Sequence, residues 1–254
     1  MKNFRLIARL DIKMQSLIKG IHMEGWRKVG DPRVFAAKYA AQGADELMFT
    51  DVVASLYKRN TLHDIVRQVA AEVFVPMTIG GGVQSLADVS ELLACGADKV
   101  ALNTAATGRP ELITEISTTF GSQACVVAIE TIRHDGEWLV MTDNGRNHTG
   151  RKALEWAREA TERGAGEIVL TAIHKEGVGR GMDLDLIGQV CDAVRVPVVA
   201  AGGLGTADHL AQLVNETSAS AVAVAQALHW DRLTFADLRQ TLAERGYFTR
   251  PIVA

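Results

Sequence analysis

The chain has 254 residues, of which 48% are hydrophobic, and a formal net charge of -3. A chain of this size can bury one large core, and its small negative charge argues against a general nucleic-acid binder. No apolar stretch is long enough to cross a bilayer, and the start MKNFRLIARLDIK has no signal-peptide pattern. We therefore expect a cytoplasmic protein that binds neither nucleic acid nor membrane.

Short apolar runs, separated by amphipathic stretches such as ADVSELLACGAD, recur along the whole chain. They cover residues 5–10, 46–50, 75–79, 98–102, 124–129, 167–171, 197–201 and 221–225. Runs of this length predict buried strands, and the stretches between them predict helices. Eight strands alternating with helices predict an α/β fold, a single (β/α)8 TIM barrel that forms one domain over residues 1–254.

The chain also repeats itself. GADELMFTDVVAS at 43–55 recurs as GAGEIVLTAIHKEG at 164–177, and VPMTIGGGVQSLADV at 75–89 recurs as VPVVAAGGLGTADHL at 196–210. The two pairs share one offset, which is typical of internal duplication. We therefore expect two similar half-barrels, covering about residues 1–122 and 123–254.

Two carboxylates occupy matching places in these halves. Asp11 ends the first apolar run and Glu130 ends the fifth. The carboxyl ends of parallel strands are where α/β folds place their chemistry, so the pair predicts an acid and a base that face each other across one cavity. The alternative is a pair of exposed charges at strand ends.

Glycines follow the third and seventh strands. Gly80, Gly81 and Gly82 precede a helix expected near Ser85, and Gly202, Gly203 and Gly205 repeat the pattern. Backbone N–H groups and a helix N-terminus form an anion cradle in each case, to which Asn103 and Thr104 can add side-chain donors. Two cradles predict a substrate with a phosphate at each end. The alternative is that these glycines only make tight turns.

The cysteines and histidines predict no prosthetic group. Cys95, Cys125 and Cys191 lie in apolar or helical contexts without a CxxC pair, which favours buried, reduced thiols. No spacing of histidines and carboxylates resembles a metal-ligand set. We expect neither a metal nor a cofactor.

Many ordered motifs resemble one family. They are RLIARLDIK, GDP at 30–32, GADELMFTDVVAS, VPMTIGGGVQS, GADKVALNTAA, FGSQACVVAIE, GAGEIVLT and VPVVAAGGLG. The chain is similar to the HisF family, the cyclase subunit of imidazole glycerol phosphate synthase. The resemblance implies a lyase that forms a heterodimer with a HisH-type glutaminase subunit and uses its ammonia. The product is imidazole glycerol phosphate in histidine biosynthesis, and aminoimidazole carboxamide ribotide is released.

The resemblance also implies roles for particular residues. Asp11 and Glu130 take the catalytic acid and base positions, although the family ordinarily has Asp at the second. The implied substrate and phosphate contacts are Lys19, Gly81, Gly82, Asn103, Thr104, Glu176, Gly177, Gly202 and Gly203. Glu176 and His174 stand where the family has Asp, and Gln226 stands where it has Ser. A solvated loop is the plain alternative for His174.

The opposite end of the barrel carries further matches. Arg5, Glu46, Lys99 and Glu167 lie at strand starts and can close a charged ring, which the resemblance implies is a gate for ammonia. Ordinary surface salt bridges are the alternative for any one pair. Asp98 and Gln123 match positions where the glutaminase docks, and Thr78 could line a polar route through the interior.

Two other functions stay open. LDIK, SLYKRNTL, Glu130 and TDNGRNHTG look like HisF-like paralogues that use glutaminase-derived ammonia to form an acetamidino group on a nucleotide-linked sugar for surface polysaccharide. The other alternative is a barrel without catalytic activity, kept only as a docking scaffold for the glutaminase. We place the cyclase first. The sequence does not decide which carboxylate is the acid, and the loop from Lys13 to Pro32 is a candidate lid.

Overall fold

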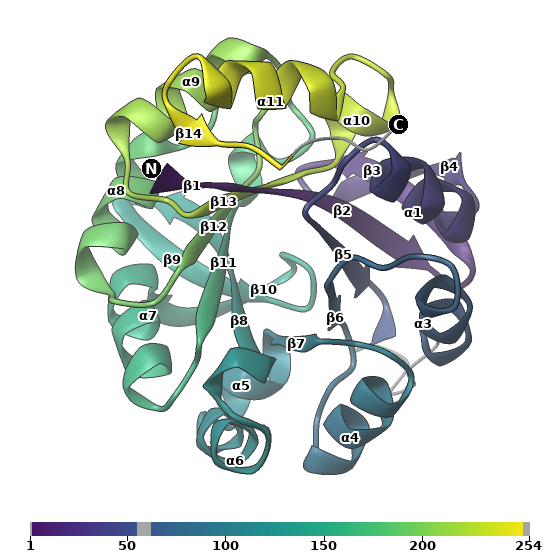
Figure 1. Cartoon of the computed structure of the whole chain (residues 1–254). Helices are drawn as coiled ribbons and strands as arrows, with labels where there is room; N and C mark the ends of the chain where they lie inside the picture. The colour runs from purple at the N-terminus through teal and green to yellow at the C-terminus, as the bar shows by residue number, and fades with distance from the viewer. Residues whose placement is uncertain (1, 55–61, 251–254) are drawn as a thin grey trace.

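The computed structural model describes residues 2–54 and 62–250 and shows a closed barrel surrounded by helices (Figure 1). The barrel strands within these residues are β2 (Arg5–Lys13), β5 (Glu46–Asp51), β6 (Met77–Gly80), β7 (Lys99–Leu102), β8 (Cys125–His134), β11 (Glu167–Ala172), β12 (Val198–Ala201) and β13 (Ala221–Val224). Neighbouring strands pair in parallel in this chain order, including β7 with β8. The last strand, β13, pairs in parallel with the first, β2, which closes the barrel.

Helices cover the outside of the barrel. The longer ones are α1 (Pro32–Ala41), α3 (His63–Ala70), α4 (Leu86–Ala94), α6 (Glu111–Phe120), α7 (Ala153–Glu162), α8 (Leu184–Ala193), α9 (Ala207–Glu216) and α11 (Phe235–Ala243). Short helical segments are α5 (Thr104–Gly108), η1 (Ser122–Ala124), η2 (Ile173–Lys175) and α10 (Gln226–His229). The predicted (β/α)8 barrel is confirmed. The strand bounds agree with prediction to within two residues, except that β2 continues to Lys13 and β8 continues to His134.

Both faces of the barrel strands are buried, and β2 shows how the sequence achieves this. Its even positions from Leu6 to Ile12 have no exposed surface and belong to the core between barrel and helices. Its odd positions point the other way, because side chains alternate along a strand. There Ile7 packs in an apolar cluster inside the barrel, together with residues such as Met48 and Val169. The other odd positions of β2 are charged: Arg5, Arg9, Asp11 and, at the exposed end of the strand, Lys13.

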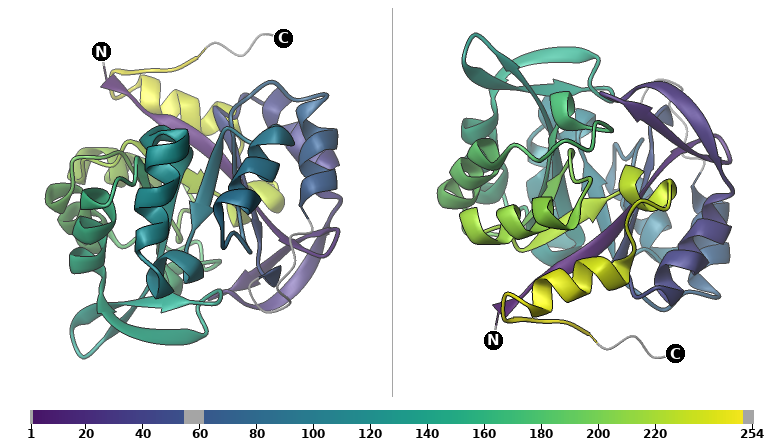
Figure 2. Two further views of the ribbon diagram at one scale, coloured as in Figure 1. Left: turned by 90° about the horizontal axis from the view of Figure 1, so that it is seen from below. Right: turned by 90° about the horizontal axis from the view of Figure 1, so that it is seen from above.

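Two β-hairpins extend the barrel at the carboxyl ends of its strands, which we call the mouth. The first, β3 (Ser16–Ile21) with β4 (Glu24–Gly30), occupies the segment predicted as a loop between Lys13 and Pro32. The second, β9 (Glu137–Thr142) with β10 (Asn147–Lys152), follows β8 and was not predicted. Figure 2 shows both hairpins at the end of the barrel opposite the two termini. The loop prediction was wrong because β3 pairs antiparallel with the end of β2.

At the other end, β1 (Lys2–Asn3) pairs in parallel with β14 (Tyr247–Phe248), so the two termini lie together. Among the helices of the described residues, none has the length and apolar character needed to cross a membrane. The three cysteines carry free thiols; Cys95 and Cys125 are buried and Cys191 is partly buried. Residues 55–61, which hold most of the SLYKRNTL motif, lie outside the described residues.

Candidate active site

The mouth holds the two predicted carboxylates, Asp11 on β2 and Glu130 on β8. Both are buried, at 7% exposure each. Glu130 lines a cavity of about 300 Å³. Four other residues predicted to contact substrate line the same cavity: Gly81, Gly82, Asn103 and Thr104. The fold therefore joins strand ends that are distant in sequence around one space.

Asp11 is held by two cations. The Nε of Arg9 donates to Oδ1 of Asp11 at 2.9 Å, and the Nζ of Lys19 donates to Oδ2 at 2.8 Å. Burial by itself would raise the pKa of this carboxyl, but the Arg9 and Lys19 charges outweigh burial and hold the pKa well below its ordinary value. Asp11 is thus a carboxylate throughout the working pH range.

Glu130 has the opposite environment. Burial raises the pKa of Glu130 to about 7, while the neighbouring Arg9 cation opposes the rise. Its Oε2 has no hydrogen-bond partner among the described residues. A carboxyl with a pKa near neutrality can both donate and accept a proton, so Glu130 is suited to general acid–base chemistry.

A chain of alternating charges runs from Asp11 toward the second cradle. Lys19, on hairpin strand β3, also contacts the carboxylate of Glu176, which follows β11. We call Arg9, Asp11, Lys19 and Glu176 the charge chain. Burial would lower the pKa of Lys19, but Asp11 and Glu176 raise it, so the ammonium stays charged. The chain ties the first hairpin to the loop after β11.

The first cradle follows β6. Gly81 has a φ of +98°, and a Cβ there would lie 2.3 Å from the carbonyl oxygen of Asp51. Ser85 starts α4 with a capping box, in which its hydroxyl accepts from the backbone N–H of Asp88. Across the cavity, Thr104 begins α5 and accepts a hydrogen bond from the backbone N–H of Asp143 at 3.1 Å. Loop glycines and two helix starts thus face one space, as an anion site requires.

The second cradle is much tighter. Its cavity measures about 10 Å³, roughly the room for one water molecule. Four residues predicted to contact substrate line it, together with Gln226: they are Glu176, Gly177, Gly202 and Gly203. The backbone N–H of Gly205 already donates to Nδ1 of His209 at 3.1 Å. The two cradles, which the sequence presents as equivalent, are therefore unequal in space.

His174 and the first hairpin complete the surroundings of the second cradle. His174 is partly exposed in η2, and its Nε2 lies 3.2 Å from Oδ2 of Asp183. The backbone N–H of His22, at the hairpin turn, donates to the carbonyl oxygen of Glu176 at 2.8 Å. The side chain of Asn144 donates to the carbonyl oxygen of Met23 at 3.3 Å, so the two mouth hairpins touch. The lid role of residues 13–32 stays a prediction.

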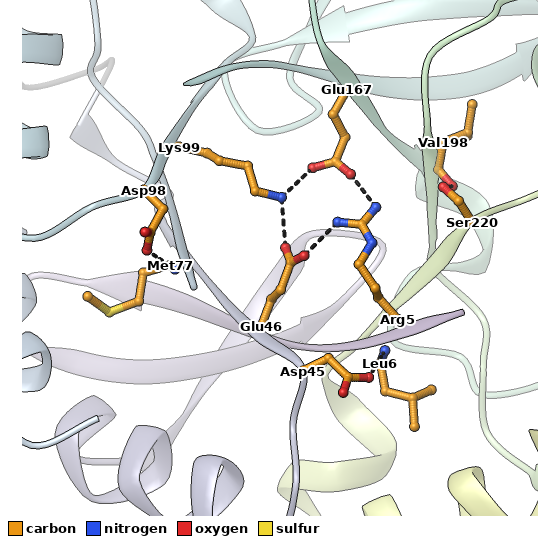
Figure 3. Close-up of polar contacts among 10 residues, drawn as sticks. All are labelled: Arg5, Leu6, Asp45, Glu46, Met77, Asp98, Lys99, Glu167, Val198 and Ser220. Atoms are coloured by element: carbon orange, nitrogen blue, oxygen red, sulfur yellow. Dashed lines mark hydrogen bonds and ion pairs between the residues drawn. The ribbon is translucent and has the colours of Figure 1, made fainter. Parts of the chain in front are cut away.

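Four charged residues close the lower opening, at the amino ends of the strands (Figure 3). Arg5 contacts Glu46 at 2.6 Å and also Glu167, while Lys99 contacts each of these carboxylates at 2.8 Å. The two cations alternate with the two anions. We call Arg5, Glu46, Lys99 and Glu167 the gate ring. Each glutamate accepts from both cations, so the ring is continuous.

The surface around the gate ring carries the predicted partner contacts. Asp98 and Gln123 are exposed, and they precede the neighbouring strands β7 and β8. The Oδ2 of Asp98 accepts from the backbone N–H of Met77 at 2.8 Å. Phe74, in the loop before β6, is 89% exposed. Thr78, expected along a polar route, is buried on β6.

Sequence reasoning missed Arg9 and Thr171. Arg9 lines both cavities, and its Nη1 donates to the hydroxyl of Thr171 on β11 at 3.0 Å. A signal was present: Arg9 stands two positions before Asp11 in a strand whose faces are both buried, where a charge is unusual. Among the described residues, no group of three His, Cys, Asp or Glu side chains forms a metal site.

Comparisons with known proteins agree with this architecture. A family model described as "Histidine biosynthesis protein" matches residues 5–234, which include every barrel strand. The chain is 56% identical over 206 residues to the imidazole glycerol phosphate synthase subunit HisF of Legionella pneumophila, covering 81% of this chain and 97% of that protein. It is 44% identical over 248 residues to the subunit of the same name from Gluconacetobacter diazotrophicus, covering 97% of this chain and 95% of that protein.

The first cradle gives a testable pair of substitutions. Gly81→Ala should lower the free energy of unfolding by roughly 1–3 kcal/mol more than Gly136→Ala, because only the former forces a Cβ against backbone. Both glycines have positive φ, so that strain is shared. Urea unfolding measures the difference, and titration with inorganic phosphate should show weaker binding only in Gly81→Ala. Equal stability and equal phosphate binding in the two variants would contradict this account.

Glu130 makes stability depend on pH. The folded chain keeps the Glu130 proton up to about pH 7, whereas an ordinary glutamate releases it near 4.5, so stability falls as the pH rises between these values. Glu130→Gln cannot ionise and should therefore be more stable than the parent at about pH 8, by up to about 3 kcal/mol. The gain should vanish near pH 4. Urea unfolding across this range tests it, with exposed Glu72→Gln as control. A pH-independent difference would refute the assignment.

Proposed function

Since the chain belongs to the histidine biosynthesis protein family, as a HisF cyclase subunit of imidazole glycerol phosphate synthase, we propose that Asp11 and Glu130 carry its proton transfers. The chain is thus a lyase of histidine biosynthesis. One observation supports the assignment above others: two buried carboxylates at one mouth have pKa values moved in opposite directions. When two titratable groups in one site have pKa values moved apart, one can transfer protons while the other stays ionised.

The proposed substrate is an open-chain ribulosyl aminoimidazole carboxamide nucleotide with a phosphate at each end. The larger cavity and its cradle, around Gly81, Gly82 and Thr104, suit one phosphate and the nucleotide body. The other phosphate would take the second cradle, beside Gly177 and Gly203. Because that cavity is small, we expect Lys19 to exchange its contact with Glu176 for the phosphate when substrate binds.

The proton transfers follow from the two environments. Ammonia adds to the ketone carbon, and loss of water from the adduct needs a proton on the departing hydroxyl. Glu130 supplies that proton and recovers one during ring closure, since its pKa lies near neutrality. Asp11 stays ionised and stabilises the cationic imine formed when water leaves. Ring closure and bond cleavage then give imidazole glycerol phosphate and aminoimidazole carboxamide ribotide.

The proposed nitrogen source is a HisH-type glutaminase in a heterodimer with this chain. The partner would dock on the face with Asp98, Gln123 and exposed Phe74. Ammonia would enter past the gate ring and cross the apolar interior to the mouth. That interior is lined mostly by small and aliphatic side chains, including Ala101, Ala201 and Ala223, which suits a small uncharged molecule.

The sugar-amidation reading has less support. Both relatives reported above carry the cyclase name, and the identity extends over most of this chain. Glu130 nevertheless departs from the Asp of the family, and an extra methylene displaces a carboxylate by about an ångström, which can change rates about 100-fold. Cyclase activity therefore separates the two functions: turnover by the parent supports the cyclase, whereas turnover by Glu130→Asp alone supports sugar amidation.

With excess ammonium salt, the purified chain should convert the nucleotide to the two products, and chromatography measures their formation. Asp11→Asn should lower kcat about 100-fold or more, because it removes the charge that stabilises the imine. Asp185→Asn, an exposed change on α8, should leave kcat unaltered. No turnover by the parent, with activity gained in Glu130→Asp, would reject the cyclase function. Near-parental kcat in Asp11→Asn would show that Asp11 is only structural.

The gate ring gives a second test. Lys99→Ala removes one of the two cations that hold Glu46 and Glu167. In the complex with the glutaminase, ammonia should then escape, and the ratio of glutamine hydrolysed to product formed should rise severalfold. Turnover with external ammonium salt should stay within about two-fold, since the mouth is untouched. Lys152→Ala, which breaks an exposed pair with Glu137, is the control. Unchanged coupling in Lys99→Ala would exclude a gating role.

A further inference from the structure

Arg9 is a buried cation inside the barrel that the proposed chemistry does not yet use. It is 4% exposed and points inward from β2, between Ile7 and Asp11. Its Nε donates to Asp11 at 2.9 Å, and its Nη1 donates to Thr171 at 3.0 Å. Strands β12 and β13 separate β2 from β11, so the side chain crosses the barrel interior. A planar guanidinium with two fixed partners has little freedom to rotate.

The position of this guanidinium is central to the mouth. Arg9 lines both the larger cavity and the smaller one, and among the described residues no other side chain is shared by the two linings. The apolar cluster that contains Ile7 and Val169 lies directly below it along the strands. A substrate that spans both cradles would pass over Arg9, and ammonia that rises through the interior would reach it first.

The charges around Arg9 are unbalanced without it. The carboxylates of Asp11, Glu176 and Glu130 all act on it and outweigh its burial, which raises the pKa of Arg9 and keeps it charged. Glu130 in turn faces Arg9, Asp11 and Glu176. Removing Arg9 would leave Lys19 as the remaining cation of the charge chain, facing the carboxylates. Burial lowers the pKa of His229, near Lys19 and Asp11, to about 3, so this histidine adds no charge.

Resting on the proposed function, we propose that Arg9 is a positioning residue, which orients the Asp11 carboxylate and balances the negative charge around Glu130. Orientation comes from the bond to Asp11, with Thr171 bracing the other end of the guanidinium. Charge balance comes from its place among the carboxylates. Arg9 therefore acts on the reaction through both catalytic residues, and it decides how their protonation states differ.

Three variants separate these effects. Arg9→Met removes charge and bonds, so it should lower kcat about 10- to 100-fold and raise the titration midpoint of Glu130 by about one pH unit. Arg9→Lys keeps the charge and should restore the midpoint, with a smaller loss of kcat. Thr171→Val loses the brace and should lower kcat without moving the midpoint. KM should change less than kcat in all three. Exposed Arg67→Met should change nothing.

The midpoint is measured directly by NMR on chain labelled with ¹³C at the glutamate carboxyls, with Glu130→Gln identifying the signal. This titration needs no turnover, so it tests Arg9 even if the parent does not convert the nucleotide and the proposed function fails. An Arg9→Met midpoint equal to that of the parent overturns the proposal. If Arg9→Met does not fold, a Glu130 midpoint in Arg9→Lys about one pH unit above that of the parent, or parental kcat in Arg9→Lys, overturns the proposal equally.

Discussion

Four buried side chains at the mouth alternate in charge and hold one another in place. In the charge chain, Arg9 bonds to Asp11, Asp11 to Lys19, and Lys19 to Glu176. Buried charges are tolerated only when they are paired, so removing one member would leave its neighbour as an unpaired buried charge and destabilise the fold. The charge chain fixes Asp11 as a carboxylate and anchors the first hairpin over the mouth, while burial holds the pKa of Glu130 near neutrality.

The interior of the barrel holds an apolar cluster between two charged layers. Below lies the gate ring, in which the cations and carboxylates are matched. Above lies the charge chain, which Glu130 makes richer in carboxylates. The same strand supplies Arg5 to the lower layer, Ile7 to the apolar one and Arg9 to the upper one, because every second residue of β2 points inward. On the proposed route, ammonia would therefore pass the gate ring first, then the apolar cluster, and then the charge chain.

The two cradles show how a repeated sequence can give unequal sites. Both have positive-φ glycines before a capped helix, α4 or α9. The first opens on a cavity of about 300 Å³ and the second on one of about 10 Å³. The difference arises from neighbouring side chains: Glu176 lines the second cradle and is held by Lys19, and Gln226 lines the cradle as well. Family membership fixes the reaction class, while these side chains shape how this barrel receives the two ends of a substrate.

The sequence alone was enough to predict the barrel, the strands that carry Asp11 and Glu130, and the glycine turns, because these depend on local periodicity and on residues that few conformations accept. It also placed the four residues of the gate ring at strand starts. It did not predict the two hairpins at the mouth, the contrast between the cradles, or which carboxylate keeps its proton. Those depend on contacts such as Arg9 with Thr171 and Lys19 with Glu176, which join residues more than 150 positions apart. Burial and neighbouring charge, which set a pKa, exist only once the barrel has closed.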